Sequence, residues 1–169
     1  MTRLAHMAEQ VGALLKQRTE TVAVAESSAG GVISAALLAI RGASAYFKGG
    51  GVVYTGDAKQ MLMAVTDDAM AEARAATETH ALHLARSARE RLEADWGIGE
   101  TGAAGPTGNR YGDAPGHTCL AISGKSEQAI TIETGSNDRE QNMWAFATAA
   151  LKLLEDCLSS EGNPPRIPS

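Results

Sequence analysis

The fold is decided by Thr21-Val22-Ala23-Val24-Ala25-Glu26-Ser27-Ser28-Ala29-Gly30-Gly31, a stretch that leads into an apolar run from Val32 to Ile40. Its first five residues are small or β-branched and predict a short strand, whereas residues 26–31 predict a polar turn. The apolar run predicts a buried helix, and residues 51–55 predict the next strand. This order indicates a parallel strand pair joined by a right-handed crossover.

The rest of the chain supplies further helices and strands for the same sheet. A stripe at helical spacing predicts an opening helix, with Leu4, Met7, Ala8, Val11, Leu14 and Leu15 buried. Further helices are predicted at 58–62 (capped by Asp57), at 67–94, and from Asn137, where Glu140 completes an approximate capping box. Further strands are predicted at 96–101, 117–123 and 128–134, the last two as a hairpin. We expect one α/β domain over residues 1–160, three-layer α/β/α with a mixed, partly parallel sheet, and a flexible tail over residues 161–169.

The composition excludes several classes of protein. Apolar residues make up 44% and charged residues 21% of the 169 positions, which is typical of a globular chain and not of a disordered one. The net charge of −5 argues against a general nucleic-acid surface. Two cysteines are too few for a disulfide framework and lack metal-ligand spacing. The apolar run 32–40 is about half of a membrane span, and the N-terminal residues lack a secretory apolar core. We therefore expect a cytoplasmic protein without a metal, a membrane or a nucleic-acid partner.

The turn at residues 26–31 is the strongest local signal for chemistry. A helix that begins after a strand directs unpaired N–H groups and a partial positive charge toward a ligand. The hydroxyls of Ser27 and Ser28, together with Gly30 and Gly31, would let a phosphate or a polarised carbonyl approach the backbone. The alternative is that the serines simply cap the helix.

Lys59 is the second candidate, because a cation is poorly placed in the first turn of a helix. Burial and the helix dipole would lower its pKa, so that a neutral amine accepts a proton from a serine hydroxyl. In a weaker version Lys59 is a point charge for a phosphate. The alternative is a solvated surface lysine.

The third candidate is the stretch from Gly102 to Asp113, which is too rich in glycine for regular structure. It either surrounds a ligand, with Gly102, Gly105, Asn109 and Arg110 as binding residues, or packs on a second subunit. Arg139, in the first turn of the last helix, is placed to face an anion.

Two other patterns do not indicate a site. Gly97-x-Gly99-x-x-Gly102 matches a dinucleotide fingerprint by letters, but it follows a helix and opens none, so it is discarded. His80 and His83 lack a third metal ligand and are interpreted as a helix-surface pair.

Several ordered motifs together resemble one family over essentially the whole chain. They are Ala25-Glu26-Ser27-Ser28-Ala29-Gly30-Gly31, Gly42-Ala43-Ser44-Ala45-Tyr46-Phe47, Gly50-Gly51-Val52-Val53-Tyr54, Ala58-Lys59, Gly102-Ala103-Ala104-Gly105-Pro106 and Asp138-Arg139. This pattern is similar to the C-terminal domain of CinA, the competence/damage-inducible protein, whose freestanding form is nicotinamide mononucleotide amidase. The resemblance implies a three-layer α/β/α domain, usually a homodimer or higher homo-oligomer, that needs no cofactor. It also implies hydrolysis of the carboxamide of nicotinamide mononucleotide to the acid mononucleotide and ammonia, in pyridine nucleotide salvage.

The resemblance also assigns roles to single residues. Ser27 matches the nucleophile, Lys59 the lysine that activates it, Tyr54 a nearby tyrosine, and Arg139 the substrate-binding arginine. The family commonly has Glu-Ser-Cys-Thr-Gly-Gly in the turn, so Ser28 is a departure that leaves the identity of the nucleophile open.

Two other functions stay open at this point. The loop and the last helix, where Asn142-Met143-Trp144 replaces a second arginine, also depart from the family pattern. An amidase-like hydrolase for another amide is one alternative, and a non-catalytic module that binds a nucleotide or a partner is the other.

Overall fold

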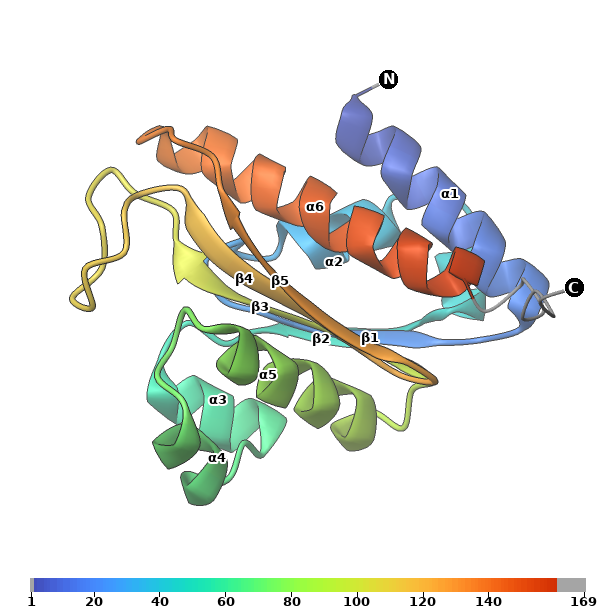
Figure 1. Ribbon diagram of the computed structural model, residues 1–169. Helices are drawn as coiled ribbons and strands as arrows, with labels where there is room; N and C mark the ends of the chain where they lie inside the picture. The colour runs from blue at the N-terminus through green and yellow to red at the C-terminus, as the bar shows by residue number, and fades with distance from the viewer. Residues whose placement is uncertain (1, 161–169) are drawn as a thin grey trace, which may run out of the picture.

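Short runs of small and β-branched residues form the strands of a central sheet. The computed structural model describes residues 2–160 and contains β1 (Val22–Glu26), β2 (Phe47–Val52), β3 (Trp96–Ala103), β4 (His117–Ser123) and β5 (Glu127–Glu133) (Figure 1). Their order in the sheet is β2-β1-β3-β4-β5. β2 and β3 run parallel to β1, whereas β4 runs antiparallel to both of its neighbours, β3 and β5. The predicted parallel pair and the mixed sheet are confirmed.

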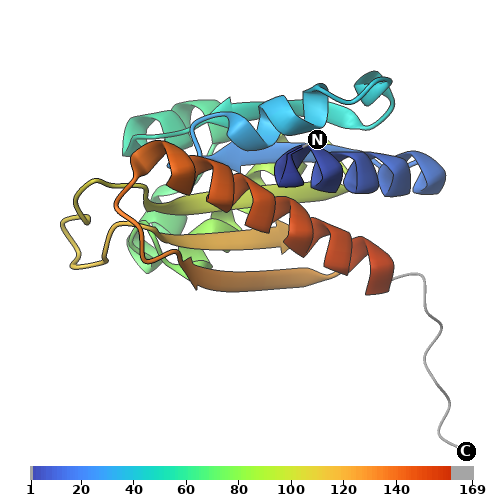
Figure 2. The ribbon, with the colours of Figure 1, turned by 90° about the horizontal axis from the view of Figure 1, so that it is seen from above.

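Helices cover both faces of this sheet. α1 (Arg3–Arg18), α2 (Val32–Leu38) and α6 (Arg139–Ser160) lie on one face, and α3 (Gly56–Met63), α4 (Asp67–Glu72) and α5 (Glu78–Arg91) on the other, as Figures 1 and 2 show. A single 3-10 turn (Ala43–Ala45) precedes β2. The predicted three-layer α/β/α architecture is confirmed. Within residues 2–160, no helix has the length and apolar character needed to cross a membrane.

Two glycines of β3 allow α5 to lie directly on the sheet. A Cβ atom added at Gly97 would collide with the carbonyl oxygen of Ala85, and one added at Gly99 with that of Ala81. The spacing that imitates a dinucleotide fingerprint is therefore explained by close backbone packing. On the other face, Trp96 and Ile98 point into the main apolar core with residues of α1, α2 and α6.

Several predicted boundaries are wrong, for local reasons. The helix predicted over residues 67–94 is two helices, because Ala76 adopts a left-handed conformation and Thr77 caps α5. Thr55, not Asp57, caps α3, and its hydroxyl accepts the N–H of Ala58 at 3.1 Å. The last helix begins after Asp138 instead of at Asn137, since the Asp138 carboxylate accepts the N–H of Gln141.

The second strand begins earlier than predicted and ends at Val52. The first part of the strand was not predicted because it contains glycines, which are unfavourable in strands. A Cβ at Gly50 would collide with Ser34 and crowd Val24, so close packing favours glycine there, whereas one at Gly51 would meet only the flexible end of Met63. The helix predicted over residues 32–40 ends at Leu38, and residues 102–103 of the predicted loop belong to β3. The predicted tail, residues 161–169, lies outside the described residues.

Candidate active site

Three segments converge where the parallel strands end. Ser27 and Ser28 follow β1, Lys59 belongs to the helix that follows β2, and Glu100 of β3 pairs with Glu26 of β1. The loop 104–116 projects from this same end of the sheet (Figure 1). Ligands of open α/β sheets gather beyond the carboxyl ends of the strands, so this is the candidate active site.

The carboxylate of Glu100 occupies the centre of this site, although the sequence analysis did not single it out. Glu100 is completely buried. Its Oε2 accepts the backbone N–H groups of Ser27 at 2.9 Å and Ala29 at 2.8 Å, and its Oε1 accepts the hydroxyls of Ser28 and, at 2.7 Å, Thr118. Four donors match the acceptor capacity of an ionised carboxylate. Burial raises the pKa of Glu100, and these hydrogen bonds limit the rise.

The two serines of the turn have different partners. Ser28 donates its hydroxyl hydrogen to Glu100, whereas the hydroxyl of Ser27 has no hydrogen-bond partner within residues 2–160. Neither serine caps α2, whose N-cap residue is Gly31 and makes no side-chain bond. Ser27 is 7% exposed, so its hydroxyl is nearly enclosed but chemically uncommitted.

Glu26 takes the place at the start of α2 that the sequence analysis left open for an anion. Its carboxylate accepts the N–H groups of Gly31 at 2.7 Å, Ile33 at 3.1 Å and Ser34 at 2.9 Å. The N–H of Gly30 is bonded to the carbonyl oxygen of Ser27 at 3.1 Å. The sequence analysis left the backbone at Gly30 and Gly31 open to a phosphate or a polarised carbonyl, but both N–H groups already have acceptors within the protein. The N–H of Ser28 has no acceptor within the described residues.

Lys59 is buried, which excludes the solvated surface lysine. It lies in the second turn of α3, where its N–H donates to the carbonyl oxygen of Thr55, and only 4% of the residue is exposed. Burial lowers the pKa of its amino group, and the negative charge of Glu100 acts in the opposite direction. A lysine in this environment has a larger neutral fraction near pH 7 than a solvated one, as a general base requires.

His80 is a second buried group near Lys59 that the sequence analysis placed on a helix surface. It is 1% exposed, its Nδ1 lies 3.0 Å from the carbonyl oxygen of Ala73, and its Nε2 is buried without a hydrogen-bond partner. Burial and the charge of Lys59 lower the pKa of His80 to about 4, so it is neutral at pH 7. The spacing of His80 and Leu84 on one face of α5 was the signal that could have revealed its burial.

Tyr54, Arg139 and Gly105 come together across the end of the sheet. The guanidinium of Arg139 donates to the carbonyl oxygen of Gly105 and, at 3.4 Å, to the hydroxyl of Tyr54. Both Arg139 and Tyr54 are exposed. These contacts join the start of α6 to the β2–α3 connection, and they place a cation at the rim of the site.

Asn109 and Arg110 are held within the loop and not at the serine turn. The side chain of Asn109 bonds Asp113 at 2.8 Å and accepts the N–H of Tyr111 at 3.0 Å. Arg110 donates to the hydroxyl of Tyr111 at 2.8 Å, and Arg74 binds Asp113 at 2.8 Å. Gly102 lies in β3, where a Cβ would collide with His117 and Thr118 of β4. These contacts explain the ordered loop without a ligand.

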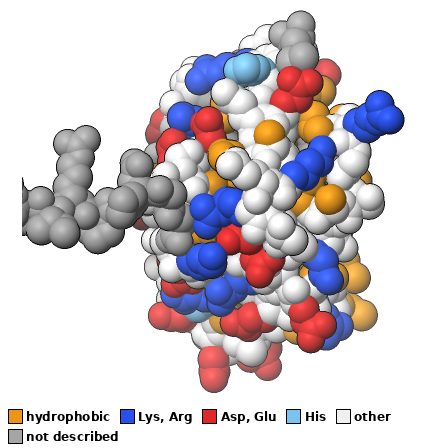
Figure 3. All heavy atoms as spheres, turned by 90° about the vertical axis from the view of Figure 1, so that its right-hand side faces the viewer, with side chains coloured by type: hydrophobic (Ala, Val, Ile, Leu, Met, Phe, Trp, Pro, Cys, Tyr) orange, Lys and Arg blue, Asp and Glu red, His pale blue; other side chains and the backbone are white. Residues whose placement is uncertain are grey.

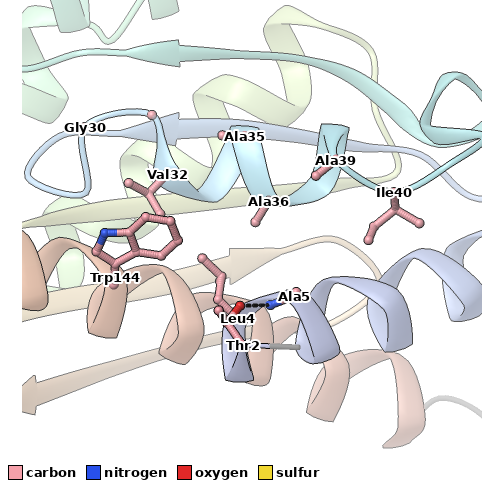
Figure 4. Close-up of a pocket in the computed structure, with 11 residues that line it drawn as sticks. Thr2, Leu4, Ala5, Gly30, Val32, Ala35, Ala36, Ala39, Ile40 and Trp144 are labelled. Carbon is pink, nitrogen blue, oxygen red and sulfur yellow. Dashed lines mark hydrogen bonds between the residues drawn. The ribbon is translucent and has the colours of Figure 1, made fainter.

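An apolar hollow of about 500 Å³ lies beside the site, between α1, α2 and the start of α6 (Figure 4). Gly30 and Gly31 border it, and Trp144 and Val32 lie at the end next to Gly30. Ser27, Lys59, Tyr54 and Arg139 do not line it. Among residues 2–160, no group of three or more His, Cys, Asp or Glu side chains is placed to hold a metal ion.

Comparisons with known proteins agree on one family. A model described as the CinA C-terminal domain matches residues 4–158. A CinA-like protein of Chlorobium limicola is 37% identical over 165 residues, which cover 94% of this chain but only 38% of the relative. A competence/damage-inducible protein of Agrobacterium tumefaciens has a TM-score of 0.86 at 28% identity, with 94% of this chain and 97% of that chain covered. A CinA superfamily protein of Klebsiella pneumoniae has a TM-score of 0.87 at 23% identity, covering 93% and 98%, a likeness that shows the fold alone.

Proposed function

The chain belongs to the CinA C-terminal domain family, and from this premise we propose that it hydrolyses the carboxamide of nicotinamide mononucleotide to nicotinate mononucleotide and ammonia. The observation that carries the proposal is a pair of groups around Glu100. One is a buried lysine whose pKa is lowered, and the other is Ser27, whose hydroxyl is uncommitted. A nucleophile and a base of this kind form a Ser/Lys pair for acyl transfer.

The reaction would proceed in two halves. Ser27 Oγ attacks the carboxamide carbon while neutral Lys59 accepts the hydroxyl proton. The oxyanion that forms needs a donor, and the N–H of Ser28 is unbonded within the described residues. Lys59 then passes its proton to the departing nitrogen, which leaves as ammonia. Water attacks the acyl-enzyme ester with Lys59 again as base, and release of the acid restores the Ser27 hydroxyl.

Arg139 and Tyr54 are proposed to orient the substrate at the rim. Two nitrogens of the Arg139 guanidinium donate to Gly105 and Tyr54. A guanidinium has five N–H donors and this side chain is exposed, so further donors remain for a ligand. An exposed cation beyond the buried lysine suits the phosphate of a mononucleotide. Arg139→Ala should therefore affect KM more than kcat.

A second candidate is hydrolysis of a different amide that lacks a phosphate. The observation that favours it is the internal bonding of Asn109 and Arg110, two residues that the sequence analysis assigned to substrate binding. If Asn109 and Arg110 do not bind substrate, Arg139 is the only cation left, among those that the sequence analysis assigned to substrate binding, to hold a phosphate. A panel of small amides separates the two functions.

The test compares wild type with Ser27→Ala, Ser28→Ala and Lys59→Ala, each checked for folding by urea unfolding. Ammonia and nicotinate mononucleotide are measured from nicotinamide mononucleotide. Ser27→Ala and Lys59→Ala should lose about 10³-fold or more in kcat, because each removes a member of a unit that acts together. Ser28→Ala should retain more activity than either.

Folded wild-type protein that releases no ammonia from the mononucleotide would overturn the proposal. Turnover on another amide in the panel would then support the second candidate. Equal activity of Ser27→Ala and wild type would overturn the assignment of the nucleophile.

A further inference from the structure

We propose that Glu100 is a positioning residue that commits the Ser28 hydroxyl as a donor and fixes the backbone of the serine turn, so that Ser27 is the nucleophile. This inference rests on the proposed function for its catalytic consequence. It adds a residue that neither the sequence motifs nor the family resemblance assigns.

The position of Glu100 in the sheet makes a purely structural role costly. Side chains alternate along a strand, so Glu100 lies on the same face of β3 as Trp96 and Ile98, which belong to the apolar core. A leucine or valine there would continue the core, whereas a buried carboxylate must be compensated by hydrogen bonds or by charge. The chain compensates it with four hydrogen-bond donors.

The donors of Glu100 are arranged so that they define the serine turn. The N–H groups of Ser27 and Ala29 bind the same oxygen, Oε2, which sets the backbone on both sides of Ser28. Oε1 takes the hydroxyl of Ser28 and the hydroxyl of Thr118 from the neighbouring strand. With its hydrogen directed to a carboxylate, Ser28 cannot give that proton to Lys59. The Ser27 hydroxyl has no such partner within the described residues, so its proton stays available to a base.

The same carboxylate acts on Lys59 through its charge. Within residues 2–160, the titratable groups that interact electrostatically with Lys59 are Glu100 from β3 and His80 from α5. His80 is neutral at pH 7, so Glu100 supplies the negative charge opposite the lysine. That charge offsets part of the effect of burial on the Lys59 pKa.

Glu100→Gln is the sharpest test, because an amide keeps the shape of the side chain and removes its charge. The amide oxygen can still accept the two N–H groups. The amide nitrogen must donate to the hydroxyls of Ser28 and Thr118, which reverses the direction of the bond to Ser28. Thr118→Val is the matched control, since it removes one hydrogen bond to the same carboxylate and leaves the charge.

The readout is the pKa of Lys59, followed by the NMR shift of its 13Cε in protein labelled at lysine. In Glu100→Gln the midpoint should move to lower pH, while in Thr118→Val it should stay near that of wild type. If the amidase is active, the acidic limb of kcat/KM should move in the same direction, and kcat should fall by about 10²-fold through misplacement of the serine turn. A structural role alone would change stability without moving the Lys59 midpoint.

Identical Lys59 midpoints in wild type and Glu100→Gln would overturn the proposal. A shifted midpoint in a protein with no amidase activity would support the placement of Glu100 and defeat only the proposed function. If Glu100→Gln does not fold, Glu100→Asp replaces it. That variant keeps the charge but withdraws the carboxylate by one methylene, so kcat should fall while the Lys59 midpoint changes little. Full activity of Glu100→Asp would also overturn the proposal.

Discussion

Two buried glutamates at opposite ends of the parallel strands are compensated in different ways. Glu20 precedes β1 and is 7% exposed, and it binds Arg18 at 2.9 Å, Lys125 at 2.7 Å and the indole N–H of Trp96 at 2.6 Å. Burial raises its pKa, but these bonds outweigh burial and hold the pKa at about 2. Acidic and basic side chains are interspersed over this end of the molecule (Figure 3).

Glu100 lies at the other end and has hydroxyl and amide donors instead of cations in contact with it. Its pKa is raised where that of Glu20 is lowered. A carboxylate with cations beside it stabilises the fold, whereas one held by hydroxyl and amide donors leaves its charge to act on a nearby lysine. The contrast assigns a stabilising role to the Glu20 end of the sheet and is consistent with the chemistry that we propose for the Glu100 end.

Glu26 gives the largest expected effect on stability and tests whether carboxylates at the Glu100 end of the sheet also hold the fold. Glu26→Ala should lower the free energy of unfolding by about 3 kcal/mol, because the N–H groups of Gly31, Ile33 and Ser34 lose their acceptor. Urea unfolding measures the loss. Glu26→Gln keeps an acceptor oxygen and should cost less. A loss for Glu26→Ala no larger than that for Glu26→Gln would contradict this account.

Substitution of Glu20 should lower the free energy of unfolding by less than substitution of Glu26, and the loss should depend on pH. Its folded pKa lies below the unfolded value of 4.5, so its contribution is present above pH 4.5 and is lost as the pH falls toward 2. Glu20→Gln should cost about 2 kcal/mol at neutral pH, a figure reduced because Lys125 is largely exposed and water screens it.

The measurement for Glu20 is urea unfolding as a function of pH, with Glu9→Gln, a change at an exposed residue of α1, as control. The Glu20→Gln curve should be flatter in acid than that of wild type. Parallel curves for the two proteins would show that the cations at this end contribute nothing.

His117 gives the smallest expected effect and links the loop to the sheet. Its Nδ1 lies 2.5 Å from a carboxylate oxygen of Glu133, and its Nε2 lies 3.0 Å from the carbonyl oxygen of Ala76. Burial opposes protonation, but the bonds to Glu133 and Ala76 and the charge of Asp113 raise the pKa. The contribution of His117 to the free energy of unfolding is therefore present below 6.5, the pKa of the unfolded state, and is lost as the pH rises through the higher pKa of the folded state.

As the pH rises through the folded pKa of His117, the free energy of unfolding of wild type should fall by a fraction of a kcal/mol, and that of Glu133→Gln should fall less. Glu133 is 56% exposed, which limits the effect through screening. Unfolding curves on the two sides of pH 6.5 would show it. Stability that rises with pH in wild type but not in Glu133→Gln would reverse the assigned sign.

Local pattern was enough where one physical rule dominated. The small and β-branched residues of β1 and the helical stripe of α1 each marked an element that the structure contains. The pattern failed where tertiary contacts override propensity. The break between α4 and α5 depends on Ala76, whose N–H donates to Thr101 in a distant strand. Gly50 of β2 and Gly97 and Gly99 of β3 have other elements packed close against them, and no neighbour in the sequence indicates that approach.

The sequence by itself determined the α/β architecture, the order of its elements and the family, because hydrophobic period and ordered motifs are properties of the chain alone. It also indicated Ser27, Lys59, Tyr54 and Arg139 as candidate site residues. Only the tertiary structure decided that Lys59 is buried, that Glu26 fills the anion position of α2, and that Glu100 holds the serine turn. Burial and hydrogen bonding depend on which residues fold next to each other, and Glu100 is 72 positions away from the serine that it holds.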